Sequence, residues 1–110
     1  MHELFWRPLY SSLTIKLGAV WNQYREVFDP YDESIDKVVT GSLADDLSDI
    51  YVDLRQGEDF WSHGLFDEAV WQWRFGFESH WGEHATSALR AIRTLSASHD
   101  LRFPPDDGAN

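Results

Sequence analysis

The sequence contains no cysteine, which excludes disulfide bonds, thiolate nucleophiles and zinc sites built from cysteine. It also lacks any run of about 18 apolar residues, so we expect no membrane-spanning helix. Its first ten residues, MHELFWRPLY, do not combine a basic segment with an apolar run, so no secretory signal peptide is predicted. These absences together predict a cytoplasmic protein.

Basic residues are scarce, because nine lysines and arginines stand against nineteen aspartates and glutamates, for a formal net charge of −10. The excess of acid lies in residues 29–68, and the remainder of the chain is balanced. A field of this sign repels phosphates, so nucleic-acid binding is not expected. It would attract cations or a basic protein partner, and it would equally serve as a solvated face that aids solubility.

Aromatic residues, in contrast, make up 15% of the 110 residues, and six of them are tryptophan. This content and length predict one folded domain with a core of its own. We assign that domain to residues 1–98 and expect residues 99–110 to form a flexible acidic tail, since this stretch has no apolar face.

Apolar residues that recur every three or four positions predict an all-α fold with three main helices. The first helix is expected over residues 8–28, followed by a surface loop over residues 29–41 that is rich in turn-forming residues. The second helix is expected from Ser42 to His63-Gly64, and the third over residues 67–96. Because only two or three residues join the second helix to the third, we expect an antiparallel hairpin within a helix bundle.

Helix-capping residues support these boundaries. Ser42 is a good N-cap with Asp45 three residues later, and Gly64 is typical of a helix end. Asp67 is the expected N-cap of the third helix, with Phe66 and Trp71 at the two positions of a hydrophobic staple.

One stripe of the third helix is expected to face the core: Val70, Phe77, Trp81, Ala85, Ala88, Ile92 and Leu95. Arg74 lies on this stripe, and Glu78 follows four residues later. Charged side chains are almost never buried unless they are paired. We therefore predict a buried polar cluster in which Arg74 pairs with Glu78 or with Asp49 or Asp53 of the second helix.

A second constellation has the residue types of a metal site. His80 and His84 are spaced i, i+4 and share one side of the third helix, and Asp46, Asp49 and Asp53 form a carboxylate stripe on the second. Equal distances from the turn bring Asp46 level with His84, so we expect at least a hydrogen bond or ion pair between them. The stronger hypothesis is a shared divalent cation, because mixed carboxylate and imidazole donors suit Mn, Fe or Zn. If these groups are only paired or solvated, no cofactor is needed.

The aromatic side chains exceed what three helices readily cover. Trp21, Trp61, Trp73 and Phe75 are the candidate interface residues, since large exposed apolar patches usually mark protein contacts. This predicts a homo-oligomer, most simply a two-fold dimer. A hydrophobic ligand pocket between the helices is the alternative.

Three segments point to a family: VFDPYD, GSLADDLSDIYVDL and EAVWQWRFGFESHWGEHA. Over about residues 20–95 the chain resembles a bacterial group known as domain of unknown function 5063. This resemblance implies a small, all-helical cytoplasmic protein and transfers no catalytic residue.

The function predicted from the sequence is a non-enzymatic interaction or regulatory module with an acidic face. The serines have no nucleophile elbow around them and no phosphate-binding loop is present, so an enzyme is not the favoured interpretation. The alternative is a divalent-metal-binding protein, or a small metal-dependent hydrolase, that uses the aspartate stripe and the two histidines.

Overall fold

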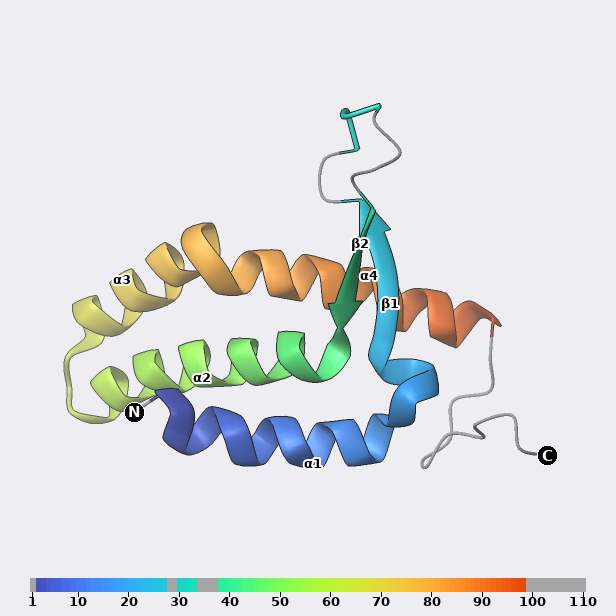
Figure 1. Cartoon of the computed structure of the whole chain (residues 1–110). Helices are drawn as coiled ribbons and strands as arrows, with labels where there is room; N and C mark the ends of the chain where they lie inside the picture. Colours follow the sequence, from blue (N-terminus) through green and yellow to red (C-terminus); the bar gives the residue numbers. More distant parts are fainter. Residues whose placement is uncertain (1, 28–29, 34–37, 99–110) are drawn as a thin grey trace.

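The computed structural model describes residues 2–27, 30–33 and 38–98. This part of the chain is mostly helical, as predicted, but it also contains a two-stranded antiparallel sheet (Figure 1). The elements in chain order are α1 (His2–Asn22), β1 (Gln23–Val27), β2 (Val38–Ser42), α2 (Leu43–Ser62), α3 (Phe66–Gly76), the π-helical turn η2 (Phe77–Trp81) and α4 (Gly82–Ser98). The predicted tail, 99–110, lies outside the described residues.

The helices lie side by side with α2 in the middle (Figure 1). Helix α1 lies along one side of α2, and the segment formed by α3, η2 and α4 runs back along its other side. The sheet stands up from the end of the helices where α2 begins. Segments far apart in the sequence, β1, the start of α2 and α4, therefore meet at one place.

The predicted end of the first helix, within 8–28, is wrong. Gly18 has a φ of 67°, a left-handed conformation that costs glycine little, and it kinks α1. The helix ends at Asn22, and Gln23–Val27 is a strand. Tyr24 and Val27 satisfied helical spacing by coincidence, because the five residues of β1 alternate between exposed and half-buried positions, as strands do.

The loop predicted over 29–41 is also wrong in its last part. Val38–Ser42 forms β2, in a register that pairs Gln23 with Ser42 and Val27 with Val38. Its β-branched residues favour a strand, but a run this short is ambiguous until its partner is known.

Both ends of α2 are confirmed. The Ser42 hydroxyl accepts a hydrogen bond from the backbone N–H of Asp45 at 3.2 Å. The Asn22 side-chain oxygen accepts from the N–H of Ala44 at 2.7 Å, so the end of α1 helps to cap α2. Gly64, with a φ of 77°, follows the helix and reverses the chain.

The predicted third helix, 67–96, is interrupted by η2. The N–H of Gly82 donates to the carbonyl of Phe77, five residues earlier, which is the π-helical pattern. A Cβ atom at position 82 would overlap that carbonyl oxygen, so the turn requires glycine. The N-terminal details are wrong too, because α3 begins after Leu65 without a side-chain cap from Asp67. Phe66 packs on Trp61, while Trp71 stacks on Phe75, so the expected staple does not form.

The main core cluster lies between α1, the start of α2 and α4, and its buried members are Leu17, Trp21, Leu43, Ala44 and Ala88. The predicted core stripe of the third helix is wrong in part: Val70 of α3, Phe77 of η2 and Ile92 of α4 are exposed, whereas Ala88 is buried. Instead Ala69 and Gly76 are buried, and the indole N–H of Trp73 donates to the Leu54 carbonyl of α2 at 3.0 Å. Small residues and Trp73 therefore bring α3 against α2, whereas the other aromatic residues of α3, such as Trp71 and Phe75, are exposed.

Candidate metal centre between α2 and α4

The side chains of Asp46 and His84 meet between α2 and α4, as their distances from the turn predict. His84 Nδ1 lies 2.7 Å from Asp46 Oδ1, and the Asp46 residue is 5% exposed. An ionised carboxylate only accepts hydrogen bonds, so Nδ1 of this imidazole carries the proton and donates it. The predicted hydrogen bond is confirmed.

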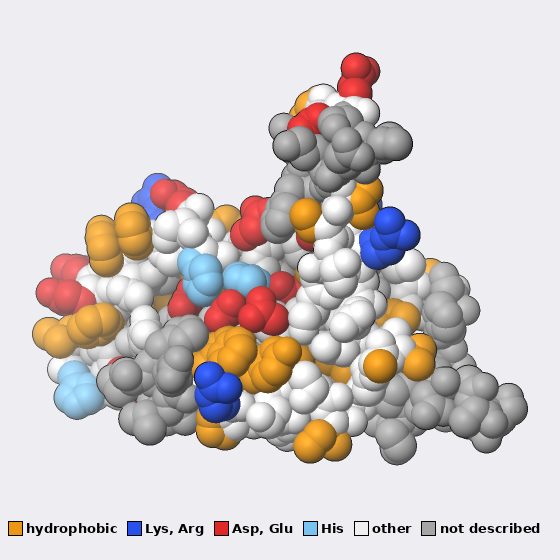
Figure 2. Space-filling model, viewed as in Figure 1, with side chains coloured by type: hydrophobic (Ala, Val, Ile, Leu, Met, Phe, Trp, Pro, Cys, Tyr) orange, Lys and Arg blue, Asp and Glu red, His pale blue; other side chains and the backbone are white. Residues whose placement is uncertain are grey.

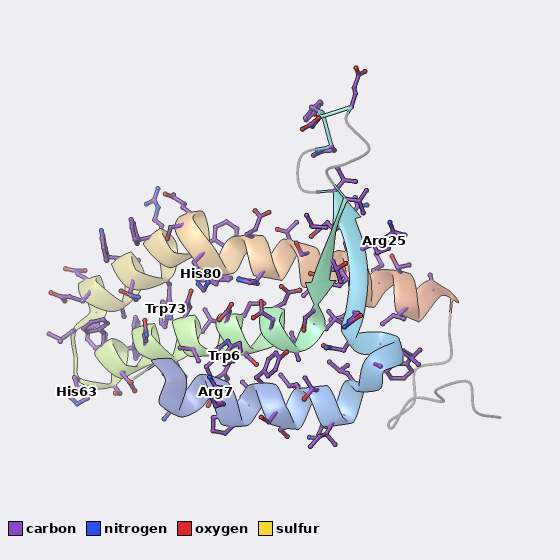
Figure 3. All side chains as sticks on the ribbon, in the orientation of Figure 1. Trp6, Arg7, Arg25, His63, Trp73 and His80 are labelled. Atoms are coloured by element: carbon purple, nitrogen blue, oxygen red, sulfur yellow. The ribbon has the colours of Figure 1, made fainter. Side chains whose placement is uncertain are left out.

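His80 repeats the arrangement one helical turn earlier. Its Nδ1 lies 2.6 Å from Asp53 Oδ2, which assigns the proton to Nδ1 here as well. Figure 3 shows His80 in the space between η2 and α2, far from His63, which lies near the turn that joins α2 to α3. Each imidazole is thus held by its own aspartate.

The second nitrogens of both rings turn toward Asp49. His84 Nε2 lies 3.0 Å from Asp49 Oδ2, and His80 Nε2 lies 3.6 Å from the same oxygen. The Asp49 residue is 8% exposed, and the two rings meet edge to face with centroids 4.9 Å apart. Three potential donor atoms therefore converge within 4.8 Å of one another.

The π-helical turn keeps the two histidines on the same side as the buried residues of the helical segments before and after them. In an unbroken α-helix each step of four residues drifts by about 40° around the axis. Positions 76, 80, 84 and 88 would therefore leave a common face. The slower rotation through η2 offsets this drift, so buried Gly76 and Ala88 bracket the two histidines on the side toward α2.

Tyr24 of β1 completes the polar network. Its hydroxyl donates to Asp46 Oδ2, so Asp46 accepts from the tyrosine on one oxygen and from His84 on the other. Burial and the Asp46 carboxylate raise the pKa of Tyr24 well above its ordinary value, so the phenol stays neutral and remains a donor. A second link ties the sheet to α4, because the Ser87 hydroxyl donates to Glu26 Oε2 at 2.7 Å.

The electrostatics of the cluster favour a positive charge. The hydrogen bond to Asp46 is the main cause that raises the pKa of His84 above 6.5, against the effect of burial, and the charges of Asp49, Asp46 and Asp45 act in the same direction. Burial and the neighbouring charges of Asp49 and Asp46 raise the pKa of Asp45. Crowded carboxylates next to imidazoles form a place where a cation is stabilised.

An open pocket of about 550 Å³ borders the cluster. Tyr24, Asp45, Asp46, His80, Glu83 and His84 are among its lining residues. In Figure 2, pale-blue histidine side chains lie directly beside a red patch of acidic side chains on this face. Among the described residues that line the pocket none is lysine or arginine, so a phosphate group would find no guanidinium or ammonium group there.

Arg74 and Glu78 do not join this cluster, and the predicted burial of Arg74 is wrong. Their side chains are 83% and 68% exposed, and they form a long ion pair with each other at 4.0 Å. The predicted pairing of Arg74 with Glu78 is therefore present, but on the outer surface. The physical reason is the rotation of α3, which turns Ala69, Trp73 and Gly76 toward α2 in place of the expected stripe.

The four candidate interface residues differ in their exposure to solvent. Trp21 is only 5% exposed within the core, so its assignment to an interface is wrong. Trp73, which is labelled in Figure 3, is half-buried. It stacks on Trp61 with ring centroids 6.0 Å apart. Trp61 and Phe75 are exposed.

The sequence interpretation missed Tyr24 and the contribution of Asp45. Tyr24 falls within the helix expected over residues 8–28, and the signal that could have placed it in a strand is the alternating pattern of Gln23–Val27. The sequence indicates Asp45 only as part of the cap of the second helix, although its side chain also lies 3.9 Å from His84 Nδ1.

A family model described as Domain of unknown function (DUF5063) matches residues 2–98. No curated protein and no solved structure matches the chain. Among the described helices, none is long and apolar enough to cross a membrane.

Proposed function

The chain belongs to the DUF5063 family, and we propose that it is a divalent-metal-binding protein whose ion is held by Asp49 Oδ2, His80 Nε2 and His84 Nε2. The observation that carries this proposal is the orientation of the two imidazoles. Each ring places Nδ1 against a separate carboxylate and turns Nε2 toward the same oxygen of Asp49.

The arrangement has both parts of a protein metal site. Histidines that bind a metal usually donate their other N–H to a carboxylate, which fixes the tautomer and the ring orientation. Asp53 and Asp46 occupy that supporting position here. Donors bound to zinc at about 2.0–2.2 Å in a tetrahedron lie about 3.3–3.6 Å apart. The Asp49 Oδ2 to His Nε2 distances of 3.0 and 3.6 Å are close to that spacing.

The donor set also restricts which ion would bind. Two imidazoles and one carboxylate suit zinc and the neighbouring first-row ions better than magnesium or calcium, which prefer oxygen donors. Three protein donors leave a coordination position for water, and the pocket beside His80 and His84 gives access to it. The acidic lining does not favour a phosphate substrate, so we propose metal binding and assign no hydrolytic reaction.

The experiment is a titration of the metal-free full chain with Zn²⁺ and Mn²⁺ by calorimetry, with the metal content of the purified protein measured in parallel. We expect about one ion per chain. Asp49→Asn keeps the shape of a ligand but removes its charge, and should weaken binding by at least about 10-fold. Asp53→Asn, which removes only the supporting carboxylate, should weaken binding about 10-fold or more.

His63→Ala is the matched control, because His63 is exposed at the other end of α2 and should leave the affinity unchanged. Long-range ¹H–¹⁵N spectra of the imidazoles provide a second measurement. They should show Nδ1 protonated in both His80 and His84 when the ion is bound. If the wild type binds no ion, or if Asp49→Asn binds as tightly as the wild type, the proposal is wrong.

An interaction role is the second candidate function, and a specific observation favours it. Trp71 and Phe75 form a stacked aromatic pair on the outer side of α3, with centroids 4.9 Å apart, and both are exposed. Exposed aromatic pairs of this kind are typical of protein interfaces.

A further inference from the structure

We propose that the outer face of α3 is a self-complementary surface that pairs two copies of this chain about a two-fold axis. The face consists of Asp67, Val70, Trp71 and Arg74, which follow i, i+3, i+4, i+7 spacing and therefore lie along one side of the helix. All four are exposed, and Trp71 is 61% exposed. This inference does not depend on metal binding, because the face lies opposite the side of α3 that contacts α2.

The charges at the two ends of this face indicate that its binding partner is a second copy of the chain. An acid, Asp67, lies at one end, and a base, Arg74, lies at the other, with two apolar residues between them. Two antiparallel copies of α3 related by an axis between positions 70 and 71 bring Val70 of each copy against Trp71 of the other. The same axis sets Asp67 of each copy opposite Arg74 of the other, so both ends are neutralised at once.

The state of Arg74 in the single chain fits this arrangement. Its ion pair with Glu78 is long, at 4.0 Å, and both side chains are largely exposed, so the contact contributes little. The guanidinium is therefore free to take a second carboxylate at small cost. A basic partner fits this face less well, because Arg74 stands within it and would repel that partner.

The aromatic side chains supply most of the attraction between the two copies, whereas the charges set the orientation of one copy relative to the other. Trp71 is held flat on Phe75, with an interplanar angle of 4°, so it loses little side-chain freedom on association. The two-fold repetition doubles every contact, which favours a closed dimer over a chain of molecules.

The experiment is sedimentation equilibrium of the full chain at about 1–100 µM and 0.15 M salt, where long-range repulsion between the acidic molecules is screened beyond about 8 Å. We expect a reversible dimer. Trp71→Ala should weaken dimerisation by at least about 10-fold, because truncated tryptophans at interface centres have large effects. Arg93→Asp is the control for the charge-changing variants of Arg74 described next. It makes the same change of charge on an exposed residue of α4 and should leave dimerisation unchanged.

Exchanging the charges of Asp67 and Arg74 tests whether this surface, and no other, forms the dimer. Arg74→Asp alone and Asp67→Arg alone each place like charges opposite one another, and each should weaken the dimer about 10-fold. The double variant D67R/R74D restores opposite charges and should recover the wild-type dimer to within about threefold. Circular dichroism checks that every variant is folded. A monomeric wild type at 100 µM, a dimer indifferent to Trp71→Ala, or a double variant no better than the single ones would each overturn the proposal.

Discussion

The side of the α3–α4 segment that faces α2 carries histidines bound to aspartates, whereas the outer side of α3 carries exposed aromatic residues. In most small helical proteins polar groups are outside and aromatic groups are inside. Here polar groups near the centre of the molecule form a hydrogen-bonded network, and Trp71 and Phe75 are left in solvent. Both departures have a cost in stability when the chain is alone, and both would be offset by binding, of an ion on one side and of protein on the other.

The largest expected effect comes from removing the acceptor shared by Tyr24 and His84. Asp46→Ala should lower the free energy of unfolding by about 3 kcal/mol, because it leaves a half-buried phenol and a half-buried imidazole without their carboxylate. Urea denaturation of the metal-free protein measures this change.

The neighbouring acid provides the control for that variant. The pKa of Asp45 is raised, so its charged form is disfavoured in the folded protein, and Asp45→Asn should be neutral or slightly stabilising at pH 7. Equal losses of stability from Asp46→Ala and Asp45→Asn would show that the network is only a general acidic face.

The next effect concerns the π-helical turn that directs the histidines inward. A Cβ at position 82 would overlap the Phe77 carbonyl and lie 2.9 Å from Phe77 Cδ2. Gly82→Ala should therefore cost about 1–3 kcal/mol and rotate His84 relative to His80. We expect this variant to lose Zn²⁺ binding, and calorimetry measures that loss. Gly64→Ala is the matched control, since its φ of 77° makes alanine unfavourable while nothing lies within 4 Å of the added atom. If Gly82→Ala binds Zn²⁺ as tightly as the wild type, the π-helical turn is not needed for the geometry of the site.

The same two faces show how far the sequence alone could lead. Helix α2 was predicted at both ends because Ser42 and Gly64 act through local geometry. The approach of Asp46 to His84 was predicted because a tight turn fixes the register of the two segments that follow it. Both inferences use only neighbouring residues and one turn.

The errors arise where the outcome depended on distant partners. The strand Gln23–Val27 is stabilised by pairing with Val38–Ser42, and five residues without their partner look like the end of a helix. The outward position of Arg74 follows from the rotation of α3, and the tight packing of Trp73 against Gly57 of α2 holds that rotation. A wheel drawn at 100° per residue assumes that apolar residues face the core and that no π-helical turn intervenes, and both assumptions fail here.

A smaller effect, on the inner face, is the pH dependence of the metal-free protein. The pKa of His84 is raised above 6.5 in the folded state, chiefly by its hydrogen bond to Asp46. The folded state therefore holds this proton more tightly than the unfolded chain does. The resulting stability is fully present below about pH 6 and is lost as the pH rises through the folded pKa.

We expect the melting temperature in the presence of a chelator to fall between about pH 6 and pH 8. The raised pKa of Asp45 has the same sign, but it is raised from a much lower ordinary value, 3.8. His84→Gln should flatten the slope. Saturating Zn²⁺ should reverse it, because the ion takes the place of a proton and binds more tightly as the pH rises. A slope that persists in His84→Gln would assign the titration to another group.

The smallest effect is expected on the outer face, at Arg74. Had its side chain been buried, replacement by alanine would leave a charge unpaired and cost about 3–5 kcal/mol. Because the side chain is 83% exposed and its ion pair with Glu78 is 4.0 Å long, Arg74→Ala should change the stability of the monomer by less than about 0.5 kcal/mol. The measurement is urea denaturation at a protein concentration low enough that the wild type is monomeric. At high concentration the same variant should lose stability relative to the wild type, since the contact with Asp67 of a second copy is removed and dimerisation stabilises only the folded chain. A difference from the wild type that does not depend on concentration would place the contribution of Arg74 within one chain and contradict the two-fold pairing of α3.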